Sequence, residues 1–198
     1  MTYKIQCTFE GEKGSSILYR PLTIKPENDD SNKEQIELAL NRIQKVFSLN
    51  DDRLLLVVAS MIIEERIDDL LRVFLKKPKE LDERDLTFSQ RIGLLKSLRL
   101  VPSYITNNAD LLRLSRNRFA HDIDLDSVDN LPDKILGKLK PYLTENNVSK
   151  EHLETRDNRD LFVDITFIAV MGCLVFRGTV HSLSELMNDD TKLEALLT

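Results

Sequence analysis

The residues whose types and spacing best suit chemistry are Arg116, Asn117 and His121, in the segment Leu111-Leu-Arg-Leu-Ser-Arg-Asn-Arg-Phe-Ala-His-Asp122. On a helix, Asn117 and His121 share a face because four positions separate them, and Arg116 lies one position round. A guanidinium, an amide and an imidazole so grouped could hold a phosphate or carboxylate and move a proton beside it. In RNA cleavage without a metal, His121 would exchange the proton, Arg116 would stabilise charge on the phosphate, and Asn117 would orient the reacting groups.

A structural role for the same residues is the alternative reading. Glu65 and Asp69 are four positions apart and continue the stripe that begins with Val58 and Ile62, which predicts that they face inward. Arg116 could neutralise one of these two carboxylates. In that case the cluster ties the fourth predicted helix to the second.

The charge distribution limits the partners of this chain. The net charge is −5, which argues against a protein that coats nucleic acid through bulk electrostatics. Between residues 91 and 118, however, six basic residues face a single acid, Asp110, and they predict a local basic patch in which Arg113 and Arg118 would contact phosphate. The six are Arg91, Lys96, Arg99, Arg113, Arg116 and Arg118. No helix-turn-helix is visible, because Gly93 lies within an amphipathic helix, so sequence-specific DNA binding is not expected.

Six helices are predicted to position these residues. Asp51 and Asp52 suit the positive end of a helix dipole, and the run from Leu54 to Ile63 is apolar all round, which predicts a central buried helix. The acidic stretch from Asp122 to Asp133 is expected to be a solvated connection. The predicted ranges are a helix opened by the capping box Ser31-Asn-Lys-Glu34, then Asp51 to about Pro78, Thr87 or Ser89 to Leu100, about Asn108 to His121, about Pro132 to Leu143 and about Asp160 to Met187.

The N-terminal stretch has a different pattern. Tyr3, Ile5, Cys7 and Phe9 alternate with polar residues, and residues 11–16 read as a turn, which predicts a β-hairpin. We therefore expect residues 1–29 to form a hairpin extension with a linker, and residues 30–198 to form one all-α helical bundle.

Cysteine usage and hydropathy indicate a soluble cytoplasmic protein. Cys7 and Cys173 form no paired motif, which favours a reducing compartment. The longest apolar run, Leu161 to Phe176, contains Asp164 and is shorter than the roughly 20 residues of a membrane span. The histidines are scattered and no glycine-rich phosphate loop is present, so we expect no metal site and no cofactor.

Three blocks of the sequence resemble the mannitol operon repressor family in their order. They are Leu56-Val-Val-Ala-Ser-Met-Ile-Ile-Glu-Glu-Arg-Ile-Asp-Asp-Leu70, Phe88-Ser-Gln-Arg-Ile-Gly-Leu-Leu-Lys-Ser-Leu-Arg-Leu100 and Arg116-Asn-Arg-Phe-Ala-His121. The last block is also similar to the Arg-x4–6-His signature of HEPN domains, including the polar residue directly after the Arg. The resemblance covers roughly residues 54 to 122 and implies an all-helical fold, self-association and a role in gene regulation.

Two functions follow from these observations. The first is a non-enzymatic regulator, a helical homodimer that acts through protein partners. The alternative is a metal-independent HEPN-type endoribonuclease with RNA as its partner, whose site forms where Arg116 and His121 of two copies meet. Many HEPN toxins carry a Tyr two residues after the His, whereas this sequence has Ile123, a departure that weighs against toxin-like cleavage. An open cleft around Arg116 and His121, lined by Arg113 and Arg118, would favour the nuclease. Internal neutralisation by Glu65 or Asp69 would favour the regulator.

Overall fold

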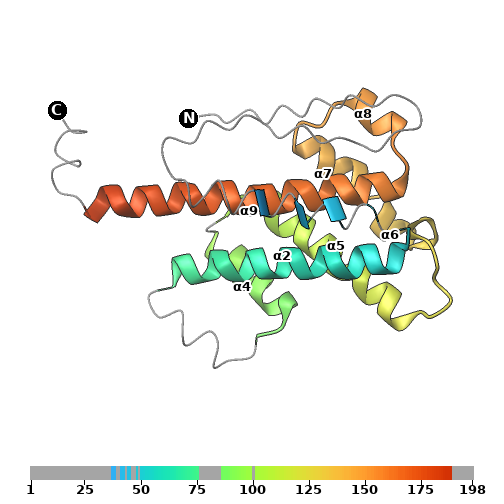
Figure 1. Cartoon of the computed structure of the whole chain (residues 1–198), viewed down its shortest axis with the longest axis horizontal. Coiled ribbons are helices and arrows are strands. Elements are labelled where there is room, and N and C mark those ends of the chain that lie inside the picture. The colour runs from blue at the N-terminus through green and yellow to red at the C-terminus, as the bar shows by residue number, and fades with distance from the viewer. Residues whose placement is uncertain are drawn as a thin grey trace.

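The described part of the chain is all helical, which confirms the predicted helical bundle there. The computed structural model describes residues 50–75, 86–99 and 101–188, with side chains as far as residue 178, and some residues between 37 and 48. The predicted hairpin at residues 1–29 lies outside the described residues. Figure 1 shows the α-helices: α2 (Asp52–Phe74), α4 (Phe88–Leu98), α5 (Ser103–His121), α6 (Asp133–Leu136), α7 (Leu139–Glu145), α8 (Lys150–Thr155) and α9 (Asn158–Asn188). A short 3-10 helix, η1 (Val128–Asn130), lies between α5 and α6.

Helix α2 begins and ends close to the predicted residues. The Asp51 side chain accepts a hydrogen bond from the Leu54 amide at 2.9 Å, which satisfies one of the free donors of the first turn. One side of α2 is buried, but the prediction that its apolar half is buried all round is wrong. Leu54 and Met61 are 45% and 61% exposed, because only the opposite side of the helix meets the core.

A short connection that ends at Pro102 joins the next two helices, α4 and α5. Thr87 and Gln90 form a capping box that begins α4, and Arg99 ends it in the left-handed region with φ 51°. Helix α5 begins at Ser103 rather than near Asn108. Pro102 occupies the N-cap of α5, a position at a helix start where a residue without an amide hydrogen costs nothing.

The region between α5 and α9 differs most from the prediction. The predicted fifth helix is two short helices, α6 and α7, and α8 was not predicted at all. The stretch from Asp122 to Asp133 is not simply a solvated connection, because Leu125, Val128 and Leu131 are buried in it. These three apolar residues are spaced three positions apart among acidic residues, and three are too few to predict a helix.

Helix α9 is the buried centre of the bundle. Every residue from Leu161 to Leu174 is buried, and α2, α5 and α7 pack around it. The segment Asn158–Gly178 is long and apolar enough to span a membrane, but 78% of its most apolar window is buried against the other helices. This arrangement is compatible with a soluble protein, whose core helix must be apolar on all sides.

Gly172 allows α5 and α9 to approach closely. A Cβ atom at this position would lie 2.8 Å from Cε2 and 2.9 Å from the hydroxyl of Tyr104, and 3.0 Å from Cγ1 of Ile105. We predict that Gly172→Ala lowers the free energy of unfolding by about 1–2 kcal/mol in a urea titration, because overpacking outweighs the gain in helix propensity.

The matched control is Gly93→Ala, in the exposed face of α4. An added Cβ there meets no described atom within 4 Å, so only helix propensity changes and stability should rise by up to about 1 kcal/mol. An equal rise in both variants would contradict the close packing of α5 on α9.

Candidate functional site

The predicted site residues lie on the last two turns of α5. Arg116 and Asn117 are half-buried, whereas His121, the last residue of α5, is exposed. Five positions separate Arg116 from His121, so they point about 140° apart around the helix axis. The structure thus places Asn117 near the direction of His121, and Arg116 on the flank that faces α2.

Arg116 is paired with a carboxylate of α2, but not with either of the predicted ones. Its Nη1 lies 3.8 Å from Oε2 of Glu64, and its Nη2 donates to Oδ1 of Asn117 at 3.3 Å. Both Arg116 and Glu64 are 30% exposed at the side chain. Glu64 replaces Glu65 and Asp69 because it lies on the flank of α2 next to α5, about 100° round the helix from Glu65.

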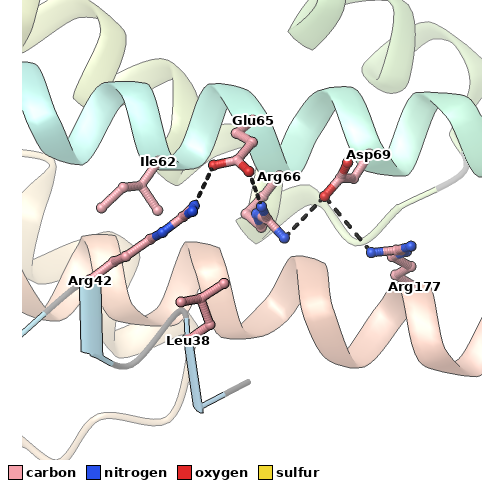
Figure 2. A pocket seen from close by; sticks show the side chains of 7 residues that line it. All are labelled: Leu38, Arg42, Ile62, Glu65, Arg66, Asp69 and Arg177. Atoms are coloured by element: carbon pink, nitrogen blue, oxygen red, sulfur yellow. Dashed lines mark hydrogen bonds and ion pairs between the residues drawn. The ribbon is translucent and has the colours of Figure 1, made fainter. Parts of the chain in front are cut away.

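Glu65 and Asp69 belong to a separate ionic cluster, with three arginines (Figure 2). Glu65 pairs with Arg42 at 3.0 Å and with Arg66, and Asp69 pairs with Arg66 at 3.0 Å and with Arg177 at 3.8 Å. These side chains line a surface groove of about 310 Å³ with Leu38 and Ile62. The predicted stripe through Ile62, Glu65 and Asp69 faces α9, Leu38 and Arg42 rather than Arg116. Glu65 is 49% exposed at the side chain, so the prediction that it faces inward is wrong.

The predicted basic patch is largely neutralised. Arg113 pairs with Asp110 at 2.8 Å, Arg118 with Asp122 at 2.8 Å, and Lys96 with Asp110 at 3.7 Å. Arg91 of α4 lies 3.8 Å from Glu64 and 3.5 Å from Asp68. The prediction counted only residues 91–118, whereas Glu64, Asp68 and Asp122 lie outside that segment, and Asp110 within it pairs with two of the cations.

His121 stands apart from the charged groups around it. Within the ranges that the structure describes, it has no hydrogen-bond or ion-pair partner. Neither the groove at Glu65 nor a second hollow, beside Arg53, includes Arg116 or His121 in its lining. In one copy of the chain, therefore, His121 and Arg116 do not face a common point.

Arg53 binds the C-terminal end of α5, a role that the sequence analysis did not predict. Its guanidinium donates to four carbonyl oxygens, those of Phe119 (2.7 Å), Asp122 (3.2 Å), Ile123 (3.0 Å) and Leu125 (2.9 Å). It also lies over the Phe119 ring, 5.7 Å from the centroid. One Arg can satisfy the otherwise unpaired carbonyls of a helix end, but no sequence pattern announces this contact.

A buried charge cluster joins α8 to α9. Asp164, only 4% exposed, binds Nε2 of His152 at 2.9 Å and Nη2 of Arg156 at 3.2 Å. Arg156 also pairs with Asp160 at 3.0 Å, and burial raises the pKa of the Asp160 carboxyl against the lowering effect of Arg156. Asp164 was visible in the sequence as an acid within an apolar run, but its partners lie on and after the unpredicted α8. Among the described residues, no group of three His, Cys, Asp or Glu side chains could hold a metal ion.

We predict that Arg53→Met lowers the free energy of unfolding by about 1–3 kcal/mol in chemical denaturation, because several carbonyl oxygens lose their donor. His121→Ala should change it by less than about 0.5 kcal/mol, since an exposed side chain without partners is removed. A larger loss for His121→Ala than for Arg53→Met would contradict this assignment.

Removal of Asp164 should be more damaging. Asp164→Ala removes the buried carboxylate that His152 and Arg156 share, although Arg156 keeps its ion pair with Asp160, and we expect it to cost about 3–5 kcal/mol of unfolding free energy. Glu154→Ala, at an exposed position of α8, is the control and should be nearly neutral. Similar values for the two variants would show that the cluster does not hold α8 on α9.

Comparisons with protein-family models, with curated proteins and with solved structures gave no match. The resemblance to the mannitol operon repressor family therefore rests on the three sequence blocks, and the function must be argued from the geometry around Arg116.

Proposed function

We propose that this chain is a non-enzymatic regulatory protein, a helical homodimer that acts through protein partners in transcriptional regulation. The observation that carries the proposal is the divergence of the two groups required for cleavage. Arg116 faces Glu64 and Asn117 on one flank of α5, and His121 faces solvent on another.

This divergence matters because metal-free phosphodiester cleavage needs a charge-stabilising group and a proton-transfer group at one reacting centre. The remaining cations offer little help to a phosphate, since Arg113 and Arg118 are each held by a carboxylate on their own helix or at its end. The net charge of −5 adds a general repulsion of nucleic acid. These features fit a protein surface that meets other proteins, in the cytoplasm as the cysteine usage suggests.

The HEPN-type endoribonuclease remains the second candidate, and one observation favours it. The Arg116–Glu64 distance of 3.8 Å exceeds a hydrogen bond, and both side chains are partly exposed. Arg116 could therefore turn toward a second copy of the chain. In this candidate function the catalytic groups are Arg116, Asn117 and His121, and each site draws on both copies.

Cleavage of a mixed RNA pool in the presence of a chelator tests the two functions. We expect no cleavage by the purified protein, and the same background from the wild type, His121→Ala and Arg116→Ala, because His121 does not face the Arg116 guanidinium and Glu64 is already paired with it. Circular dichroism would confirm that all three proteins are folded. Cleavage by the wild type that disappears in both folded variants would contradict the regulatory proposal and establish a metal-independent nuclease.

A further inference from the structure

An apolar strip runs along the outer side of α2, opposite the core. Leu54 is 45% exposed and Met61 is 61% exposed, with Val57 half-buried between them. These residues follow one another at three- and four-residue spacing, so they lie in a row on the helix surface. Glu64 follows Met61 at the same spacing, where the row reaches the Arg116 ion pair.

The C-terminal half of α5 lies antiparallel beside this row. Two contacts fix the register: Arg53 with the Phe119 carbonyl at 2.7 Å, and Ser60 with the Leu112 carbonyl at 3.2 Å. The long side chains of Glu64 and Arg116 meet beside them. The surface that α2 and α5 share therefore has two distinct ends. From Leu54 to Glu64 it extends about 15 Å along α2.

The end near Leu54 is acidic and hollow. Ile123, 86% exposed, stands there between Asp122 and Asp124. A surface hollow of about 380 Å³ lies beside it, with Asp51 and Asp126 among its lining residues, which also include Asn50, Asp52, Arg53, Ile123 and Leu125.

The end near Glu64 is cationic. Arg91 and Arg116, from two different helices, each lie 3.8 Å from the Glu64 carboxylate. Arg91 also lies 3.5 Å from Asp68, which Arg72 binds at 2.8 Å, so three arginines share two carboxylates. Neither contact with Glu64 is as short as a charge-assisted hydrogen bond, which spans about 2.7–2.9 Å. Arg116 is 30% exposed at the side chain, so its guanidinium can bind a further carboxylate from outside.

We propose that this surface is the homodimer interface, and that its occupant is a second copy of the chain placed by a two-fold axis near Val57 and Met61. This inference rests on the dimer of the proposed function and assigns it a surface. An isologous interface requires one surface to complement itself after rotation. Here the acidic hollow of one copy receives the Arg116 end of the other, and the reverse contact forms at the same time.

The apolar middle of the strip completes the interface. Around the two-fold axis, Met61 of one copy packs against Val57 of the other, and Leu54 and Ile123 lie toward the Arg116 end of the second copy. Apolar groups at the centre of an interface supply most of its affinity, and charges at the rim set its register. The exposed apolar face of α2 and the loosely paired arginines then have one common explanation.

Sedimentation equilibrium tests the surface directly. We expect the wild type to be dimeric, and Met61→Glu and Ile123→Glu to raise the dimer dissociation constant roughly tenfold or more, with unchanged helical circular dichroism. Leu98→Glu is the matched control, because Leu98 is equally apolar and 45% exposed but lies on α4 outside the strip. It should leave the dissociation constant unchanged.

A charge exchange tests the two-fold register. Arg116→Glu and Asp126→Arg should each weaken self-association, since both homodimers then bring like charges together. An equimolar mixture of the two variants should recover the dimer, because every contact in the mixed dimer is again a Glu–Arg or Arg–Asp pair. A dimer that persists in Met61→Glu and Ile123→Glu would overturn this surface while the proposed dimeric regulator stands. A monomeric wild type would overturn both, whatever the RNA assay shows.

Discussion

The burial of α9 is the constraint on which the rest of the structure depends. Residues Leu161 to Leu174 are buried without exception, and a helix that is apolar on every side must be covered on every side in water. Helices α2 and α5 provide most of this cover, and α7 closes another side. Gly172 sets how near α5 can come. Asp164 is the one charged residue in the buried run, and it is tolerated because His152 and Arg156 meet it from α8 and the adjoining turn.

Once α2 and α5 both lie on α9, their mutual register decides the chemistry that α5 can perform. Arg53 holds the carbonyl end of α5, and Ser60 binds the Leu112 carbonyl within the interface. This register brings Arg116 to Glu64 and leaves His121 at the exposed end of the helix. The contacts that order α5 are therefore the contacts that separate the Arg from the His. A site that uses both groups requires a second copy, whereas a regulatory surface does not.

Helix α2 explains how one apolar segment can serve two surfaces. Its inner side packs on α9 and α5, and its outer side carries Leu54 and Met61 in contact with solvent. Exposed apolar rows flanked by opposite charges are typical of surfaces that associate. The acidic hollow lies at one end of this row and the arginine pair at the other. The two ends therefore differ in charge, which would orient a partner, whereas an isolated apolar patch would not.

Local pattern by itself determined the helices that have strong signals. The acids Asp51 and Asp52, the helix start at Thr87 or Ser89 and the long apolar run after Asp160 located α2, α4 and α9, because helix-start signals and periodicity act within a few residues. Helices α6 and α7 were predicted as one helix, and α8 was not predicted. A helix of one or two turns is stabilised by tertiary packing rather than by its own sequence. The candidate site divides in the same way. The grouping of Arg116, Asn117 and His121 on one helix was a local property and is present. Their partners were not local: which carboxylate meets Arg116, and what holds the end of α5, depended on the rotation of α2 about its axis. Only the packing of α2 on α5 and α9 decided that rotation, because one residue step turns a side chain by about 100° and so exchanges Glu65 for Glu64.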